Sequence, residues 1–89
     1  MNVTVRLFHD LRTAIGQSEL ELEADTLNDV IKSLINQRAS VRELLFDRNG
    51  ELRSQVLYYV NNAVQNPPDL RMTLHNGDII LLIPSALGG

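Results

Sequence analysis

The residues with the clearest chemical capacity are the two glycines that end the sequence, Gly88 and Gly89. Neither has a Cβ atom, so this segment can follow a narrow channel in any backbone conformation, with the carboxylate of Gly89 at its tip. Five residues follow Pro84 and would extend about 17 Å when stretched, and none of them carries a charged side chain. The pattern predicts a flexible tail, residues 85–89, that presents a reactive carboxylate to the active site of another protein.

The remaining reactive side chains form no arrangement typical of catalysis or metal binding. His9 and His75 lie far apart in the sequence, and we expect both in solvent-facing loops. Glu19, Glu21 and Glu23 alternate along a predicted strand, which places all three on one outer, solvated face. No glycine-rich phosphate-binding motif is present. We therefore expect no catalytic residue, no metal site and no cofactor bound by this chain.

The composition is typical of one small domain. The 89 residues include 44% hydrophobic side chains, which suffice for one core but leave little material for a deep catalytic pocket. The absence of cysteine excludes disulfides, thiolate metal sites and cysteine nucleophiles. Acidic residues outnumber basic ones, 11 to 8, which disfavours a nucleic-acid partner. Because the sequence has neither a signal peptide nor a long apolar run, we expect a cytoplasmic protein without a membrane partner.

Hydrophobic periodicity divides the sequence into strands and helices. Alternating apolar and polar residues predict two N-terminal strands, joined by a long polar loop that closes at Gly16. Apolar residues spaced three and four positions apart then predict one main helix and a short helix. The predicted strands are 2–8, 18–23, 56–60 and 79–83, with a brief return at 63–64 after an Asn61-Asn62 turn; the helices run from Thr26 to about Arg38 and from Ser40 to about Phe46.

Two capping signals mark where these helices begin. Thr26 is a good N-cap, and Asp29 three residues later gives a weaker form of the capping box. Ser40 and Glu43 form the full S-x-x-E pattern, which predicts a second capped start.

The segment 79–83, Ile-Ile-Leu-Leu-Ile, is apolar on both faces, as is typical of a strand in the middle of a sheet. Its expected neighbour is the N-terminal strand, running parallel to it. A lone main helix then packs on one face of a mixed sheet. The sequence thus predicts an α+β protein with the β-grasp arrangement, a domain over residues 1–84 followed by the tail 85–89.

The last predicted strand has more apolar side chains than one face of a sheet can bury. Either Ile79, Leu81 and Ile83 or Ile80 and Leu82 must point away from the helix. Phe8 alternates out of the core and would join that exposed set, unless loops or the short helix cover it. We expect this surface to bind a partner protein, and the residues assigned to it are Phe8, Leu81, Ile83, Pro84 and Leu87.

Taken together, these features resemble the ubiquitin-like sulfur carriers. That family includes the small subunit of molybdopterin synthase, the thiamine sulfur carrier and the small archaeal modifier proteins. The shared features span the whole chain: the opening strand into Leu7-Phe8 and Leu11-Arg12, the strand 19–23, the helix from Thr26, the Val60-Asn61 turn, Asn76-Gly77-Asp78 before the last strand, and Gly88-Gly89.

The resemblance implies a carrier protein and not an enzyme. An adenylating activating enzyme would use ATP and magnesium to convert the Gly89 carboxylate to an acyl-adenylate, and a persulfide sulfur would convert this to a thiocarboxylate. The implied partners are that enzyme, a sulfurtransferase and the molybdopterin synthase large subunit. The sulfur would pass to a pterin precursor of the molybdenum cofactor or to another acceptor, such as a tRNA base.

Alternative functions remain open at this point. If a lysine amine attacks the activated Gly89, the product is an isopeptide bond to a lysine-bearing target protein, and Lys32 is the one lysine available for self-conjugation. The chain would be a monomer when free. A second alternative is a β-grasp interaction module that is not activated and whose diglycine is incidental. A small independent enzyme is disfavoured by the scarcity of acid, base and metal-binding groups.

Overall fold

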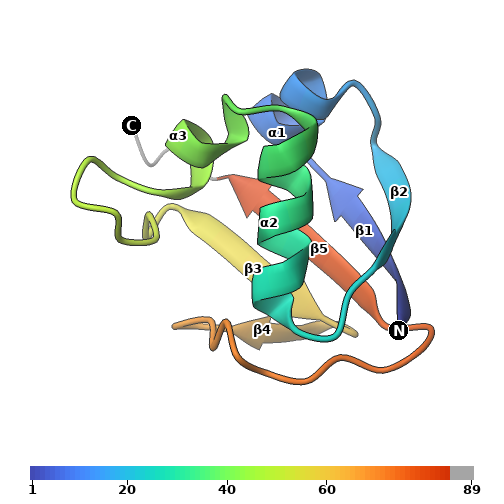
Figure 1. The fold of residues 1–89 in the computed structure, drawn as a ribbon. Helices are drawn as coiled ribbons and strands as arrows, with labels where there is room; N and C mark the ends of the chain where they lie inside the picture. The colour runs from blue at the N-terminus through green and yellow to red at the C-terminus, as the bar shows by residue number, and fades with distance from the viewer. Residues whose placement is uncertain (85–89) are drawn as a thin grey trace.

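The computed structural model describes residues 1–84 of the chain. These residues form a mixed sheet and three helices (Figure 1). In chain order the elements are β1 (Asn2–Leu7), α1 (His9–Ile15), β2 (Glu19–Glu23), α2 (Leu27–Gln37), α3 (Val41–Leu45), β3 (Val56–Val60), β4 (Ala63–Gln65) and β5 (Ile79–Pro84).

The five strands of this described part form one sheet in the order β2-β1-β5-β3-β4. β1 runs parallel to β5, and the other neighbouring pairs are antiparallel. The prediction that the last strand lies in the middle of the sheet, beside the first and parallel to it, is therefore confirmed. With α2 across one face, the molecule has the predicted β-grasp architecture (Figure 1).

The main helix, α2, supplies one half of the hydrophobic core. Its apolar stripe, Leu27, Val30, Ile31 and Leu34, is fully buried. The opposing half comes from inward side chains of the strands, which include Val5, Tyr58, Ile80 and Leu82. The predicted capping box is present, because Asp29 N donates to Thr26 Oγ1 (3.3 Å) and Thr26 N donates to Asp29 Oδ2 (3.2 Å).

The connection between β1 and β2 is a helix and not the predicted polar loop. α1 buries Leu11 completely, with Ala14 and Ile15 packed against the core. It ends at Gly16, whose φ of 86° lies in the left-handed region that glycine adopts without strain. The spacing of Leu11, Ala14 and Ile15, followed by glycine, was the sequence signal for this helix.

The short helix α3 lies where it was predicted, but its predicted cap is wrong. Ser40 has helical angles (φ -64°, ψ -18°), and its side chain makes no capping hydrogen bond. An N-cap side chain reaches the first free N–H groups from an extended backbone, which Ser40 does not have. α3 is held instead by burial of Val41 and Leu45.

None of the helices within residues 1–84 is long and apolar enough to cross a membrane.

Candidate functional site

The residues predicted to react, Gly88 and Gly89, and the predicted partner-binding residue Leu87 lie outside the described residues. The described chain ends at Pro84, the last residue of β5, which pairs with Val56 of β3. β5 is hydrogen-bonded to β1 on one side and β3 on the other. The segment that carries Gly89 is thus attached to the central strand of the sheet.

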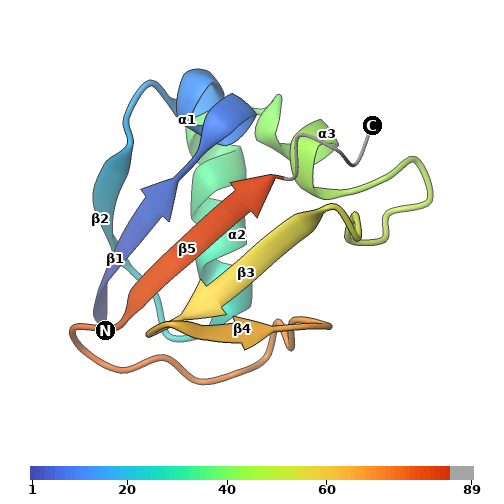
Figure 2. The same cartoon turned by 180° about the vertical axis from the view of Figure 1, so that it is seen from behind.

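Figure 2 shows the face of the sheet that lies opposite α2. Apolar residues of the two central strands β5 and β3 contribute to this face. The strand registers align Arg6, Leu81, Tyr59 and Val64 in one row across four strands. Ile83 pairs with Leu57 in an adjacent row. We call this surface the outer sheet face, and its apolar residues are Leu57, Tyr59, Val64, Ile79, Leu81 and Ile83.

The structure decides which residues of the last strand face outward. Ile80 and Leu82 are 0% exposed and belong to the core, whereas Ile79 is 37% exposed and Leu81 and Ile83 are half-buried. Leu57 and Val64 are exposed on the neighbouring strands. Leu81 and Ile83 therefore share one accessible apolar surface, on the side of β5 that the sequence analysis favoured.

Phe8 lies beside this surface, at the N-cap of α1. Its backbone is extended (φ -130°, ψ 151°) and its side chain is half-buried. The preceding residue, Leu7, pairs with Leu82, so Phe8 lies at the end of the sheet where Ile83 and Pro84 complete β5.

A charged border adjoins the outer sheet face on the β2 side. Arg6 Nε lies 2.9 Å from Glu19 Oε1, and Arg6 is the neighbour of Leu81 in the register. Glu19, Glu21 and Glu23 are all exposed, which confirms that this acidic row is solvated. Because the Arg6–Glu19 pair is itself exposed, it adds little to stability.

The histidines form no catalytic or metal-binding cluster within the part of the chain that the structure describes. His9 and His75 are both exposed. His75 Nδ1 lies 3.8 Å from Asp78 Oδ2. The Asp78 carboxylate also accepts hydrogen bonds from the Asn61 side chain and the His75 backbone. Hydrogen bonds from the side chain of Asn61 and from the backbone N–H of His75 hold the pKa of Asp78 below its ordinary value.

The two adjacent tyrosines, Tyr58 and Tyr59, have opposite environments. Tyr58 is buried beneath α2, whereas Tyr59 belongs to the outer sheet face. Burial raises the pKa of Tyr58 to about 12, because the phenolate would lose its hydration. Among the described residues the Tyr58 hydroxyl has no hydrogen-bond partner.

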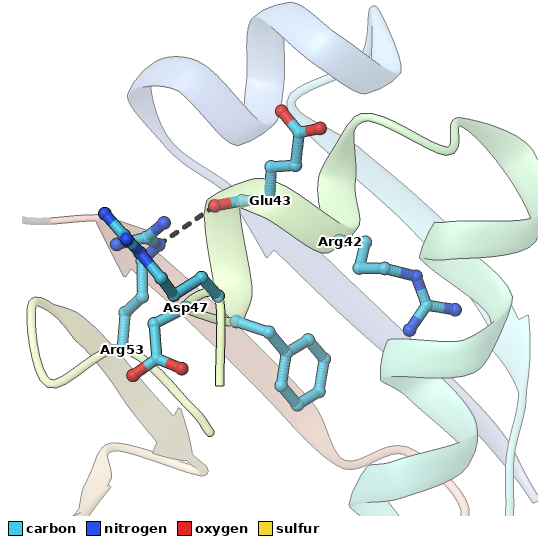
Figure 3. Close-up of a pocket in the computed structure, with 6 residues that line it drawn as sticks. Arg42, Glu43, Asp47 and Arg53 are labelled. Carbon is cyan, nitrogen blue, oxygen red and sulfur yellow. Dashed lines mark hydrogen bonds between the residues drawn. The ribbon is translucent and has the colours of Figure 1, made fainter. Parts of the chain in front are cut away.

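A second surface, which the sequence analysis missed, is a hollow of about 370 Å³ beside α3. We call it the arginine pocket. Figure 3 shows Arg42 on one side of it and Arg53 with Asp47 on the other, while the carboxylate of Glu43 points away from all three. The residues that line it are Arg42, Glu43, Phe46, Asp47, Arg48 and Arg53.

Lys32, the predicted acceptor for self-conjugation, is exposed on α2. It therefore lies on the helical layer, on the opposite side of the molecule from the outer sheet face.

Comparison with known protein families gives one match that covers nearly the whole sequence. The model of the ThiS family matches residues 5–89. A candidate sulfur carrier protein of Archaeoglobus fulgidus is 29% identical over 82 residues, which cover 89% of this chain and 93% of that protein.

Solved structures with the same fold include small archaeal modifier proteins and CysO, which are similar in length to this chain. The small archaeal modifier protein 1 (SAMP1) of Methanosarcina acetivorans superposes with a TM-score of 0.86 at 27% identity, covering 99% of this chain and 96% of its own. CysO of Mycobacterium tuberculosis superposes with a TM-score of 0.81 at 30% identity, covering 94% of this chain and 99% of its own.

Proposed function

Because this chain belongs to the ThiS family of ubiquitin-like sulfur carriers, which are carriers or modifiers and not enzymes, we propose that it is activated at the carboxylate of Gly89. The observation that carries the proposal is that the family match continues to residue 89 and so includes both terminal glycines. A glycine pair lets another protein enclose the carboxylate, because no Cβ obstructs the approach.

The proposed chemistry begins in an adenylating partner that binds ATP and magnesium. A Gly89 carboxylate oxygen attacks the α-phosphorus, pyrophosphate leaves, and the acyl-adenylate forms. The terminal sulfur of a persulfide then attacks the carbonyl carbon and AMP leaves, giving an acyl disulfide. A second thiol attacks its S–S bond, which forms a disulfide with the donor and releases the thiocarboxylate. This chain supplies only the carboxylate and the docking body, and the partner supplies the catalytic groups.

The outer sheet face is the proposed docking surface for this partner. It joins Leu81 and Ile83, half-buried on β5, to Leu57 and Tyr59 on β3 in one accessible apolar area. β5 continues directly into the tail after Pro84. A partner that covers Phe8, Leu81 and Ile83 is therefore close to the point from which Gly89 must reach its active site.

Intact mass measurement tests this function most directly. The full chain is incubated with an adenylating enzyme of the same organism, ATP, magnesium and a persulfide donor. The expected product has one oxygen replaced by sulfur, and a chain without Gly88 and Gly89 stays unmodified. Absence of both AMP formation and a mass change, with an enzyme shown to be active on another carrier, would overturn the proposal.

Conjugation to lysine is a second candidate function, favoured by the similarity to the modifier SAMP1. The same activated Gly89 would then acylate a lysine of a target protein, with loss of AMP. Adducts of higher mass that disappear when Gly89 is deleted would support this function. Isopeptide adducts of the chain to itself should disappear in Lys32→Arg, because Lys32 is the one lysine in the sequence, which leaves the N-terminal amine as the other linkage point. If neither sulfur transfer nor adducts occur, the chain is a binding module with an incidental diglycine.

A further inference from the structure

The arginine pocket concentrates positive charge on a protein that is negative overall. The formal net charge is -3, yet three of the eight basic residues, Arg42, Arg48 and Arg53, line this one hollow. The acidic row of β2 belongs to a different surface, at the edge of the sheet. A local cluster of this kind creates a positive potential in one place.

The three arginines of the pocket differ in how far contacts within the protein already occupy them. Within residues 1–84, the guanidinium groups of Arg42 and Arg48 take part in no hydrogen bond or ion pair. Arg53 is partly committed, because its Nε donates to the carbonyl of Glu43 at 2.9 Å. Arg42 and Arg48 are therefore the groups available to an outside ligand.

The pocket keeps a net positive charge, because three arginines line it with only two carboxylates, those of Glu43 and Asp47. Asp47 Oδ1 accepts hydrogen bonds from the backbone N–H groups of Asn49 and Glu51 at 2.8 and 3.1 Å, so this carboxylate closes the loop after α3. The carboxylate of Glu43 points away from Arg42 and Arg53 (Figure 3). The half-buried ring of Phe46 supplies an apolar part of the lining.

The pocket also lies close to the base of the tail. Val56 pairs with Pro84, the last residue of β5, and Val56 N donates to the carbonyl of Arg53 at 3.3 Å. α3 occupies the end of the sheet toward which β5 runs (Figures 1 and 2). A protein that encloses the C-terminus must pass over this end of the molecule.

From these observations we propose that the arginine pocket binds an acidic, partly apolar segment of the partner protein that receives the C-terminus. Carboxylates of that segment pair with Arg42 and Arg48, and an apolar side chain covers Phe46. The pocket extends from Arg42 on one side to Arg53 on the other (Figure 3), so a stretch of chain covers it more fully than a single small anion. The pocket is small and fits a few side chains.

The pocket itself can be tested on the free, full-length chain. The ¹⁵N-labelled protein is titrated with the capped peptide Ac-Glu-Leu-Asp-Phe-Glu-NH₂, and with sodium sulfate at equal ionic strength. We expect amide shifts centred on Phe46 and its neighbours, which the peptide causes and sulfate does not. The double variant Arg42→Gln/Arg48→Gln should weaken peptide binding at least threefold. The matched double variant Lys32→Gln/Arg71→Gln removes the same charge elsewhere and should leave binding unchanged.

Three results would overturn the inference about the pocket. Equal shifts with sulfate would identify a simple anion site. Equal weakening in both double variants would show that only net charge matters. Changed shifts around Phe46 in a chain lacking Gly88 and Gly89, without peptide, would show that the chain's own end occupies the pocket.

The identity of the partner rests on the proposed function and has a separate readout. In the adenylation assay, Arg42→Gln/Arg48→Gln should raise KM at least threefold and leave kcat unchanged, with greater loss at low salt. An unchanged KM would mean that the activating partner does not use the pocket. If no chain is adenylated at all, the proposed function fails, while the peptide titration still decides whether the pocket binds an acidic segment.

Discussion

The side-chain amide of Asn61 donates a 2.8 Å hydrogen bond to Oδ1 of Asp78, so the turn between β3 and β4 is fastened to the beginning of β5. Asn61 Oδ1 in turn accepts the backbone N–H of Ile79 at 2.9 Å. Asp78 Oδ2 accepts the N–H of His75 at 2.8 Å. This network fixes the start of β5, the strand that precedes residues 85–89.

The first prediction concerns acid stability. The pKa of Asp78 is lower in the folded protein than in the unfolded chain, chiefly because of Asn61. The ionised form therefore stabilises the fold above its ordinary pKa of about 3.9, and this stabilisation is lost as the pH falls through the lowered pKa. Urea unfolding at about pH 6 and at about pH 2 measures this effect. The free energy of unfolding should fall less between these two pH values in Asp78→Asn than in wild type. The surface variant Asp10→Asn is the control; if Asp78→Asn keeps the wild-type acid loss, the network does not have this role.

The second prediction compares two helix starts. Thr26→Ala removes the hydroxyl that accepts the N–H of Asp29 and should lower the free energy of unfolding by about 1 kcal/mol. Ser40→Ala should change it by less than about 0.5 kcal/mol, because the Ser40 side chain caps nothing. Urea unfolding at pH 7 measures both. Equal costs for the two variants would contradict the difference in capping.

The third prediction concerns the buried hydroxyl of Tyr58. Tyr58→Phe removes a polar group without a partner among the described residues, so the free energy of unfolding should rise by about 1 kcal/mol. Because the folded pKa of about 12 exceeds the unfolded value of about 10, wild type should lose stability as the pH rises from about 10 to about 12. Tyr58→Phe should lose less stability than wild type over this pH range, and Tyr59→Phe should lose as much as wild type. A decrease in stability of Tyr58→Phe at pH 7 would show that the hydroxyl has a partner.

The fourth prediction tests the outer sheet face. Leu81→Asp and Ile83→Asp place a charge where the activating partner is proposed to pack, and should raise KM for adenylation at least tenfold. Ile79→Asp, at the opposite end of β5 and equally outward, should have a smaller effect. Thermal unfolding of all three checks that the variants are folded. If Ile79→Asp raises KM as much as the other two variants, the partner covers the whole outer sheet face. This result would contradict docking centred on Leu81 and Ile83.

The sheet and its main helix were predictable because local patterns coincide with burial. The apolar side chains of segment 79–83 are buried only if the strand has neighbours on both sides and a helix over one face. β5 has this position. The alternation of Val3, Val5 and Leu7 placed β1 in the same way. Both signals repeat over several residues, and so the interpretation did not depend on any single one.

The features that were missed depend on contacts between distant residues. α1 has seven residues, so its sequence signal, the spacing of Leu11, Ala14 and Ile15, covers little more than one turn, and Leu11 is held by contacts with the core. The arginine pocket forms because the loop after α3 folds back: Arg53 N donates to the carbonyl of Leu45 and Asp47 N to that of Glu51, both at 2.8 Å. No periodicity in the sequence indicates such a closure.

The central position of β5 also determines how the protein responds to force. A pull on the C-terminus acts along β5, and the ladders to β1 and β3 flank this strand on both sides. Their hydrogen bonds lie across the direction of pull and are loaded in shear together, instead of opening one after another as at a sheet edge. A machine that grips this end must therefore dislodge the middle of the sheet first, so the end through which the protein is proposed to react also resists unravelling.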